Sequence, residues 1–516
     1  MSTSFNTKDI SSRAFWLILV SLWVLLLLLA ELRPLSIPDE GRYADIGRWM
    51  LLSGDWLVPR LNNIPFFHKP ALLHWLLAGA MAVFGVTTWA ARLVPALSAA
   101  LFLVALYVSS RSLVNETVAR RATVMLGTSL SFLIGGQYVN HDMLVAAWIS
   151  VAIWCFALAI LRHGRPHAGL ARLGFVACAL GILSKGLIGL VLPGLVLFTW
   201  VIWTRQLRKA LQLPWLSGLA LFALIAVPWF VLVQRQYPGM FSYMFGVQQF
   251  SRYTGNNFNN VQPWWFYGVA LCGMLFPWLV FALPQMGATR RVAPGVDERV
   301  ISLCWCWLIA VVAFFSVPSS KLLGYVLPGL PPLALLAALG WQRCVARWRW
   351  SRLAFVSLGA LAVALAVAIN TLAWRTTKDK LSGDIAKVMR LAMQPEDTVY
   401  AVGGYPYDLP FLAQLHRPMV VVQDWSAARA ANEDNWRRAL YEGVEFDVGT
   451  AHLLQTPDVL AAASQVRGSW LVAPKGYPRD GLTDWTEVWV GTGWVLYRAT
   501  PPIGDVPAPA VHFFRY

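Results

Sequence analysis

The chain has 516 residues, of which 57% are hydrophobic and only 13% are charged. Soluble domains carry about 25% charged residues, so the composition excludes a water-soluble protein and requires lipid around most of the chain. The formal net charge of +16 does not indicate nucleic-acid binding, because the basic residues stand in short clusters between apolar runs, as membrane topology demands.

The first apolar run, residues 15–30, follows Lys8 and Arg13 and has no small-residue cleavage site after it. We therefore expect a retained membrane span. With a cytoplasmic amino terminus, eleven spans place every basic cluster inside, and a range of eleven to thirteen allows for one split segment. The predicted spans lie near residues 13–31, 91–110, 121–138, 143–161, 170–184, 186–204, 213–233, 264–284, 300–317, 322–341 and 353–374.

Residues 71–84 are apolar but do not fit this parity. A full crossing would turn every later basic cluster outward, so we expect a short interfacial or re-entrant helix. The predicted fold is a polytopic α-helical membrane protein. Its non-cytoplasmic face carries loop 32–70, the turns 138–142, 184–186 and 318–321, loop 234–263 and the tail 375–516.

The tail has a different composition and holds 16 of the 26 acidic residues. Its β-rich runs lie at 398–402, 419–422 and 470–472, a strand pair is expected at 485–490 and 493–498, and helices are expected at 379–391 and 435–441. These patterns predict an external α/β domain at 375–516 after a membrane domain at 1–374.

Carboxylates are rare in the membrane part, and no Asp or Glu occurs between Met143 and Val296. They gather instead on the predicted external face, which indicates a functional site. Residues 36–40 also suit a helix start, since acids favour its positive end. The short turn 140–142 before Met143 does not need an acid for this purpose. The external acids are Asp39, Glu40, Asp45, Asp55 and Asp142.

Cations share this face with the acids. A lysine between two apolar spans can simply extend its ammonium to the interface. Several cations converging with carboxylates suit a phosphate-bearing lipid and a reacting centre. These cations are Arg42, Arg60, Lys69, Lys185, Arg235, Arg252 and Lys321.

A series of motifs follows in a fixed order between about residues 30 and 370. The first loop holds Pro38-Asp39-Glu40-Gly41-Arg42-Tyr43, the segment 54–62 and Phe67-His68-Lys69-Pro70. The later motifs lie at 140–143, 183–186, 249–253, 262–265 and 320–332. In this order they resemble the bacterial lipid A 4-amino-4-deoxy-L-arabinose transferases and the wider protein O-mannosyltransferase-like (GT-C) superfamily.

The resemblance implies transfer of a sugar from a polyprenyl phosphate carrier, with inversion, on the periplasmic face of the bacterial inner membrane. It implies that Asp39 and Asp142 are the catalytic acids. It also places Arg42, Lys69 and Arg252 near the carrier phosphate. The expected substrate-binding residues are Glu40, Arg42, Tyr43, Lys69, Lys185, Arg252, Lys321 and Tyr325.

Two positions depart from the family pattern. His68 stands where the family has Glu, and Gln249 stands where it has His. That Glu and His accompany a divalent metal in some members, so their loss removes two good ligands and we expect no metal. The six cysteines, all in or beside apolar segments, predict neither a metal site nor a disulfide framework.

The acceptor decides the chemistry expected of Asp39. A hydroxyl acceptor needs a general base, whereas a lipid A phosphate is already ionised, and a carboxylate would repel it. In that case some of Asp39, Glu40 and Asp142 would orient the donor by pairing with the ammonium of an amino sugar. Lipid A is the expected acceptor, with a protein Ser/Thr or another glycan as the alternative. A transporter is disfavoured because the sequence lacks repeated halves.

Overall fold

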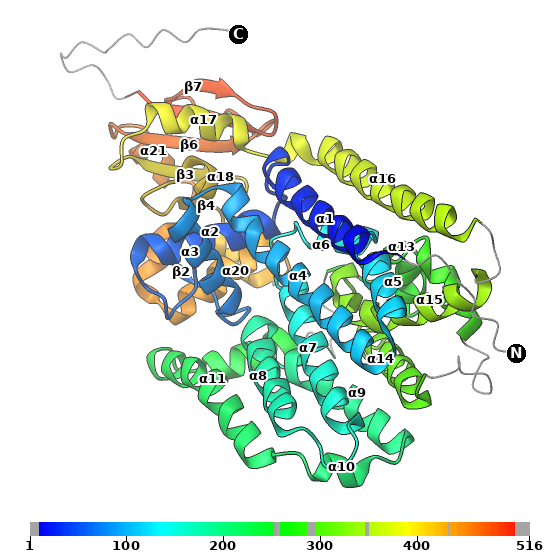
Figure 1. Cartoon of the computed structure of the whole chain (residues 1–516). Coiled ribbons are helices and arrows are strands. Elements are labelled where there is room, and N and C mark those ends of the chain that lie inside the picture. Colours follow the sequence, from blue (N-terminus) through cyan, green and yellow to red (C-terminus); the bar gives the residue numbers. More distant parts are fainter. Residues whose placement is uncertain are drawn as a thin grey trace, which may run out of the picture.

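The computed structural model describes residues 10–251, 253, 259–285, 296–345, 350–431 and 433–500. The chain forms a bundle of long helices followed by a smaller α/β unit (Figure 1). Within the described residues, eight helices are long and apolar enough to cross a membrane, or nine if one bent pair forms a single span. The prediction of a polytopic helical membrane protein with a carboxyl-terminal α/β domain is confirmed.

The spanning helices are interspersed with shorter ones along the chain. The eight are α1 (Ser12–Leu32), α4 (Thr88–Leu113), α7 (His141–Leu161), α8 (Ala168–Lys185), α11 (Trp215–Gln236), α14 (Glu298–Ser316), α15 (Leu330–Val345) with the 3-10 turn η4 (Leu323–Gly329) before it, and α16 (Ser351–Thr377).

Three predicted spans are not single long helices. They correspond to α5 (Glu116–Gly127) with α6 (Leu130–Gly135), to the shorter α9 (Ile188–Trp203), and to α13 (Phe266–Met274) followed, after a 103° bend, by η2 (Trp278–Phe281) and η3 (Leu283–Gln285). The break before α6 has a local cause, because the Ser129 hydroxyl accepts the Phe132 amide at 3.3 Å and caps a new helix. Apolar length alone does not reveal such breaks, so eleven to thirteen spans exceed the eight or nine in the described part of the chain.

Two short helices pack together beside the spanning bundle. They are α2 (Asp39–Ser53) and α3 (Leu72–Phe84). The 13 residues of α3 extend ~20 Å at ~1.5 Å per residue, short of the ~30 Å hydrocarbon layer. The expected interfacial helix therefore agrees with the length of α3. The contact with α2 requires Gly47, since a Cβ there would lie 2.7 Å from the Cβ of Leu77.

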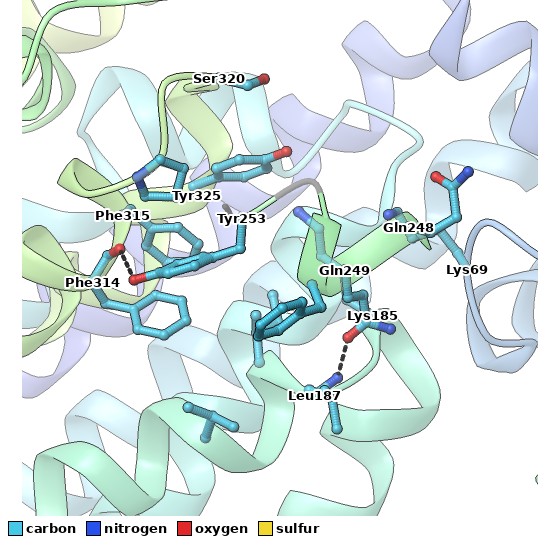
Figure 2. A pocket seen from close by; sticks show the side chains of 14 residues that line it. Lys69, Lys185, Leu187, Gln248, Gln249, Tyr253, Phe314, Phe315, Ser320 and Tyr325 are labelled. Carbon is cyan, nitrogen blue, oxygen red and sulfur yellow. Dashed lines mark hydrogen bonds between the residues drawn. The ribbon is translucent and has the colours of Figure 1, made fainter. Parts of the chain in front are cut away.

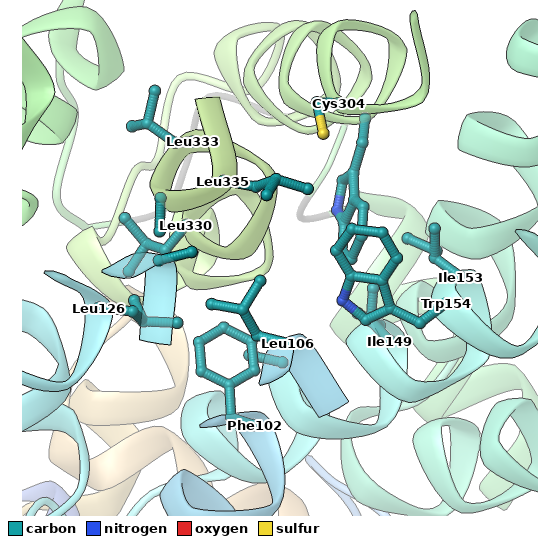
Figure 3. Close-up of a cluster of buried hydrophobic side chains, with 14 of the residues drawn as sticks. Phe102, Leu106, Leu126, Ile149, Ile153, Trp154, Cys304, Leu330, Leu333 and Leu335 are labelled. Carbon is teal, nitrogen blue, oxygen red and sulfur yellow. The ribbon is translucent and has the colours of Figure 1, made fainter. Parts of the chain in front are cut away.

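The core of the bundle surrounds α7, which is buried on nearly every face (Figure 3). Ile149, Ile153 and Trp154 of α7 lie among side chains from α4, α5, α14 and α15. The indole rings of Trp154 and Trp307 meet edge to face with centroids 5.1 Å apart. This packing holds α7 rigidly, and its first turn carries Asp142 to the site described below.

The carboxyl-terminal domain contains one six-stranded sheet of order β5-β4-β3-β6-β8-β7. Strands β5, β4, β3 and β6 are parallel to one another, and β8 is antiparallel to both of its neighbours, β6 and β7. The strands are β3 (Thr398–Val402), β4 (Val420–Val422), β5 (Leu454–Gln455), β6 (Ser469–Pro474), β7 (Trp485–Val490) and β8 (Trp494–Ala499). The helices are α17 (Gly383–Ala392), α18 (Leu409–Ala413), α19 (Trp425–Ala431), α20 (Trp436–Phe446) and α21 (Val459–Ala463). The expected strand pair near the end of the chain is confirmed by β7 and β8.

The loop between α2 and α3 joins this domain to the helical bundle. Its hairpin, β1 (Arg60–Leu61) and β2 (Ile64–Pro65), turns through Asn62 and Asn63, both with positive φ. The buried amide of Asn62 accepts the Met419 N–H at 2.7 Å and donates to the Met419 carbonyl at 2.8 Å. The loop therefore lies between the membrane helices and the sheet, where it can supply residues to a shared site.

Candidate functional site

A polar cavity of about 420 Å³ lies where α2, the start of α7 and α20 meet. We call it the polar cavity throughout. The membrane part contributes Pro38, Asp39, Arg42, Tyr43, His68, Lys69, Asn140, His141, Asp142, Lys185, Asn259, Asn260, Leu322 and Tyr325. The carboxyl-terminal domain contributes Tyr407, Asp434, Asn435, Trp436, Arg438 and Ala439.

A second, largely apolar cavity of about 310 Å³ adjoins it (Figure 2). Its walls include Leu187, Ile188 and Val191, together with Phe314 and Phe315. Three residues line both cavities. They are Lys69, Lys185 and Tyr325. An apolar chamber thus meets a polar one at two lysines and a phenol, an arrangement that suits an amphipathic molecule with an anionic junction.

Asp39 and Arg42 form an ion pair on the first turn of α2, with 2.7 Å between Oδ1 and Nη2. The Arg42 guanidinium also lies 5.4 Å from the ring centroid of Tyr43 and 5.3 Å from that of Tyr407. Burial lowers the pKa of Arg42, but Tyr43, Tyr407 and Asp39 outweigh burial and raise the pKa above its ordinary value. The guanidinium is therefore a fixed positive charge beside a carboxylate that remains one-third exposed.

Asp142 pairs with the ammonium of Lys185, which comes from the last turn of α8. Asn140 caps α7 by accepting the Asp142 N–H at 2.9 Å, and its amide donates to Asp142 Oδ2 at 2.8 Å. The Lys185 Nζ lies 4.4 Å from the ring centroid of Tyr325. A side-chain carbon at Gly324 would collide with the Asp142 carboxylate, so this close approach requires glycine.

Glu40 does not fit the substrate-binding role predicted for it. Its carboxylate is fully buried and pairs with Arg33 at 2.5 Å and Arg92 at 3.0 Å. The backbone N–H groups of Ser36 and Val139 donate to it as well. Burial raises the pKa of Glu40, but the two guanidinium groups outweigh burial and lower it to about 2. Glu40 ties α2 to α4 and to the turn before α7 without lining either cavity.

Lys321 likewise departs from its predicted role. Its ammonium donates to the backbone carbonyls of Gln262, at 3.0 Å, and of Pro318, and its backbone N–H donates to Asn260. Burial lowers the pKa of this lysine. Lys321 therefore fixes the loop between α14 and η4, whereas its neighbours Ser320 and Leu322 reach the cavities. Arg252, the remaining cation among the predicted substrate-binding residues, lies outside the described residues.

The imidazole of His141 lines the polar cavity, and that of His74 lies next to it outside the lining. Nδ1 of His141 is 2.6 Å from the Ser184 carbonyl oxygen, so Nδ1 carries the hydrogen. The rings of Tyr43 and His74 approach His141 with centroids 4.7 and 5.4 Å away. Burial lowers the pKa of His74 to about 3, so its imidazole is neutral at ordinary pH. These rings pack behind the turn that presents Asp142.

His68 is one of the two positions at which the sequence departs from the family that it resembles. Its Nε2 is 3.7 Å from Oε2 of Glu442, and its ring stacks on Phe66 with centroids 4.6 Å apart. Gln248, beside Gln249, donates to Glu442 at 3.4 Å. Among the residues that the structure describes, no three His, Cys, Asp or Glu side chains gather as a ligand set. These side chains do not fit a divalent metal.

The sequence did not predict that the carboxyl-terminal domain forms one wall of the polar cavity. No residue of the tail was expected to reach the site, yet Tyr407 and the first turn of α20 do. A sequence pattern that could have indicated this wall is Glu433-Asp434-Asn435-Trp436-Arg437-Arg438. It combines a helix cap with charges of both signs and a large aromatic ring. Its proximity to Asp39 depends on how the two domains pack, which sequence periodicity does not reveal.

Comparisons with known proteins agree with this architecture. Residues 11–244 match the family model described as dolichyl-phosphate-mannose-protein mannosyltransferase. An undecaprenyl phosphate-alpha-4-amino-4-deoxy-L-arabinose arabinosyl transferase of Pseudomonas fluorescens is 36% identical over 323 residues, which cover 60% of this chain and 57% of that protein. The corresponding enzyme of Sodalis glossinidius is 33% identical, over 65% of this chain and 60% of its own length. The alignments thus span less than two thirds of these relatives.

The fold itself is shared along nearly the whole chain. The crystal structure of ArnT from Cupriavidus metallidurans bound to undecaprenyl phosphate superposes with a TM-score of 0.80 at 22% identity, covering 97% of this chain and all of that one. An oligosaccharyltransferase from Archaeoglobus fulgidus gives a TM-score of 0.52 at 14% identity, over 90% of this chain and 70% of its own. At these identities the likeness establishes the fold.

Proposed function

We propose that the chain, which resembles the aminoarabinose transferases and shares their fold, transfers an amino sugar from a polyprenyl phosphate to lipid A. The observation that carries the proposal is the junction of the two cavities at Lys69, Lys185 and Tyr325. The apolar cavity suits the prenyl chain, the two ammonium groups suit the carrier phosphate, and the polar cavity suits the sugar and the acceptor.

The reaction breaks the bond between the anomeric carbon and the carrier phosphate. The acceptor oxygen attacks from the opposite side, so that the configuration inverts and the polyprenyl phosphate leaves with the bonding electron pair. Lys69 and Lys185 would stabilise that departing charge, and a preorganised donor of this kind contributes about 3 kcal/mol. Because Asp142 pairs with Lys185, we assign it to holding that ammonium at the junction.

Asp39 has two possible tasks, and the acceptor decides between them. With an ionised phosphate acceptor, no base is needed, and Asp39 binds the ammonium of the donor sugar. With a Ser/Thr hydroxyl or a glycan hydroxyl as acceptor, Asp39 becomes the general base. Its partial exposure on the polar cavity permits either role, whereas buried Glu40 can take neither.

We further propose that the polar cavity faces the periplasm of a bacterial inner membrane. Basic residues concentrate in cytoplasmic loops, and the short helix α10 (Leu207–Leu211) carries Arg208 and Lys209. In Figure 1, α10 lies at the opposite end of the bundle from the carboxyl-terminal domain, beside which the polar cavity opens. After replacement of the six native cysteines by alanine, a single cysteine placed at exposed Lys475 should react with a membrane-impermeant thiol reagent in intact cells, and no reaction would contradict this orientation.

The amine of the donor is expected to matter through Asp39. In proteoliposomes containing lipid A, the wild-type protein should turn over the amino-sugar donor about tenfold faster than the matching donor without the amine, because a charge-assisted pair is lost. Asp39→Asn should slow the amino-sugar donor and leave the other donor nearly unchanged. Equal wild-type turnover of the two donors would refute the ammonium pairing and favour the general-base role.

A further inference from the structure

The first turn of α20 forms the carboxyl-terminal wall of the polar cavity. The side chain of Asn435 caps the helix by accepting the Arg437 N–H at 2.9 Å. Asn435, Trp436 and Arg438 then line the cavity. The Arg438 side chain is only 13% exposed, so a positive charge is held largely away from bulk water on a wall that belongs to the second domain.

Glu442 holds Arg438 in this position. Its carboxylate lies one helical turn further on and accepts the Arg438 Nε–H at 2.6 Å. The Tyr243 hydroxyl in η1 (Ser242–Ser251) and the Gln248 amide also donate to Glu442. His68 of the first loop is 3.7 Å away. Glu442 does not itself line the polar cavity, so it fixes the guanidinium and joins α20 to the membrane part.

The cations of the polar cavity fall into two groups, those that also line the apolar cavity and those that do not. Lys69 and Lys185 also line the apolar cavity, whereas Arg42 and Arg438 line the polar one alone. Arg42 is paired with Asp39 on α2. Among the described residues, Arg438 is therefore the cation on the wall away from the junction where the carrier phosphate is proposed to lie.

An anionic acceptor needs such a cation. The polar cavity also carries three carboxylates, Asp39, Asp142 and Asp434, which repel an incoming phosphate. A guanidinium presents several N–H donors in a planar fork that matches a phosphate better than an ammonium does. A phosphate entering beside α20 would meet Arg438.

We propose that Arg438 binds a phosphate of the acceptor and that Glu442 is the positioning residue that holds Arg438 on the cavity wall. The inference rests on the proposed function and specifies its acceptor as an anion. It gives the carboxyl-terminal domain a direct part in choosing the acceptor.

The test separates the Michaelis constants of the two substrates. In proteoliposomes, Arg438→Ala should raise the KM for lipid A about tenfold or more, since a charge-assisted contact is lost, and should leave the KM for the polyprenyl phosphate donor within about twofold. Arg438→Lys should recover part of the loss because the charge returns without the fork. Glu442→Gln should raise the same KM by less than Arg438→Ala does.

A matched pair on the same domain provides the control. Arg429 and Glu445 form an ion pair at 3.0 Å, with side chains 41% and 63% exposed, and neither lines the polar cavity. Arg429→Ala and Glu445→Gln should leave both KM values unchanged. If they raise the KM for lipid A as much as the Arg438 and Glu442 substitutions do, the effect is one of domain stability and the proposal is wrong.

Dephosphorylated lipid A supplies the second arm. Wild-type protein should not use it, because the attacking phosphate and the proposed contact with Arg438 are both missing, and transfer to it with an unchanged KM would overturn the anion site. An unchanged KM for phosphorylated lipid A in both Arg438→Ala and Arg438→Lys overturns the anion site while leaving the transferase intact. Absence of transfer by the wild-type protein to either form of lipid A overturns the proposed function, and this inference with it. If Arg438→Ala does not fold, Arg438→Lys and Glu442→Gln decide the question.

Discussion

Replacement of Lys69 by alanine is expected to lower kcat/KM for the donor by about a hundredfold or more, since one preorganised cation at a departing charge contributes about 3 kcal/mol. Lys69 lines both cavities at their junction, where the carrier phosphate is proposed to leave. Initial rates with purified protein in proteoliposomes, at limiting donor and saturating lipid A, measure the effect. The thermal transition of the variant should stay close to that of the wild type.

Lys475→Ala is the matched control for this experiment. Lys475 is an exposed lysine of the carboxyl-terminal domain and lines neither cavity. Its loss changes the net charge by the same amount and should leave kcat/KM unchanged. A wild-type value of kcat/KM in Lys69→Ala would show that the carrier phosphate does not bind at the junction of the two cavities.

The largest loss of stability is expected from Glu40→Ala. This substitution leaves the guanidinium groups of Arg33 and Arg92 facing each other without the carboxylate between them, and breaking a buried ion pair on one side costs about 3–5 kcal/mol. Thermal unfolding in detergent and expression level in the membrane measure the effect. Glu445→Ala, which removes an exposed partner of Arg429, should change the unfolding free energy by about 1 kcal/mol or less.

The same carboxylate predicts a dependence on pH. The folded state lowers the pKa of Glu40 to about 2 from 4.5, so the unfolded state binds more protons between these values. Stability from this group is fully present above pH 4.5 and is lost as the pH falls toward 2. In Glu40→Gln this part of the acid dependence should be absent. An unchanged acid profile would show that Glu40 does not supply it.

Local sequence patterns predicted much of the fold because the relevant interactions are local. Apolar length located the long helices, and alternation with turn residues located β7 and β8. The breaks after α5 and within the segment 266–285 were not visible, since a single hydroxyl cap or a bend leaves composition unchanged. Helix length depends on such details, so three of the predicted spans are not among the eight single helices that are long enough to cross a membrane in the described part of the chain.

Some of the acids and cations that the sequence placed on one face lie together in the structure, and their roles in a reaction stay predictions. Asp39 with Arg42, and Asp142 with Lys185, lie together on the polar cavity as their shared face suggested. The contacts of Glu40 and Lys321 could not be predicted from the sequence, because their partners are set by tertiary packing. Arg92 is 52 positions from Glu40, and the carbonyl that accepts from Lys321 belongs to Gln262, in another loop. A charged residue one position from a cavity-lining residue can face the interior instead.

The central claim is that this protein adds an amino sugar to lipid A from a polyprenyl phosphate. Mass spectrometry of lipid A from cells that carry or lack the gene tests it most directly. We expect a species heavier by one amino sugar in cells with the wild-type protein. That species should vanish on deletion, return with the wild-type gene and stay absent with Lys69→Ala. Identical lipid A spectra with and without an expressed, membrane-inserted protein would contradict the account and direct attention to a protein or other glycan acceptor.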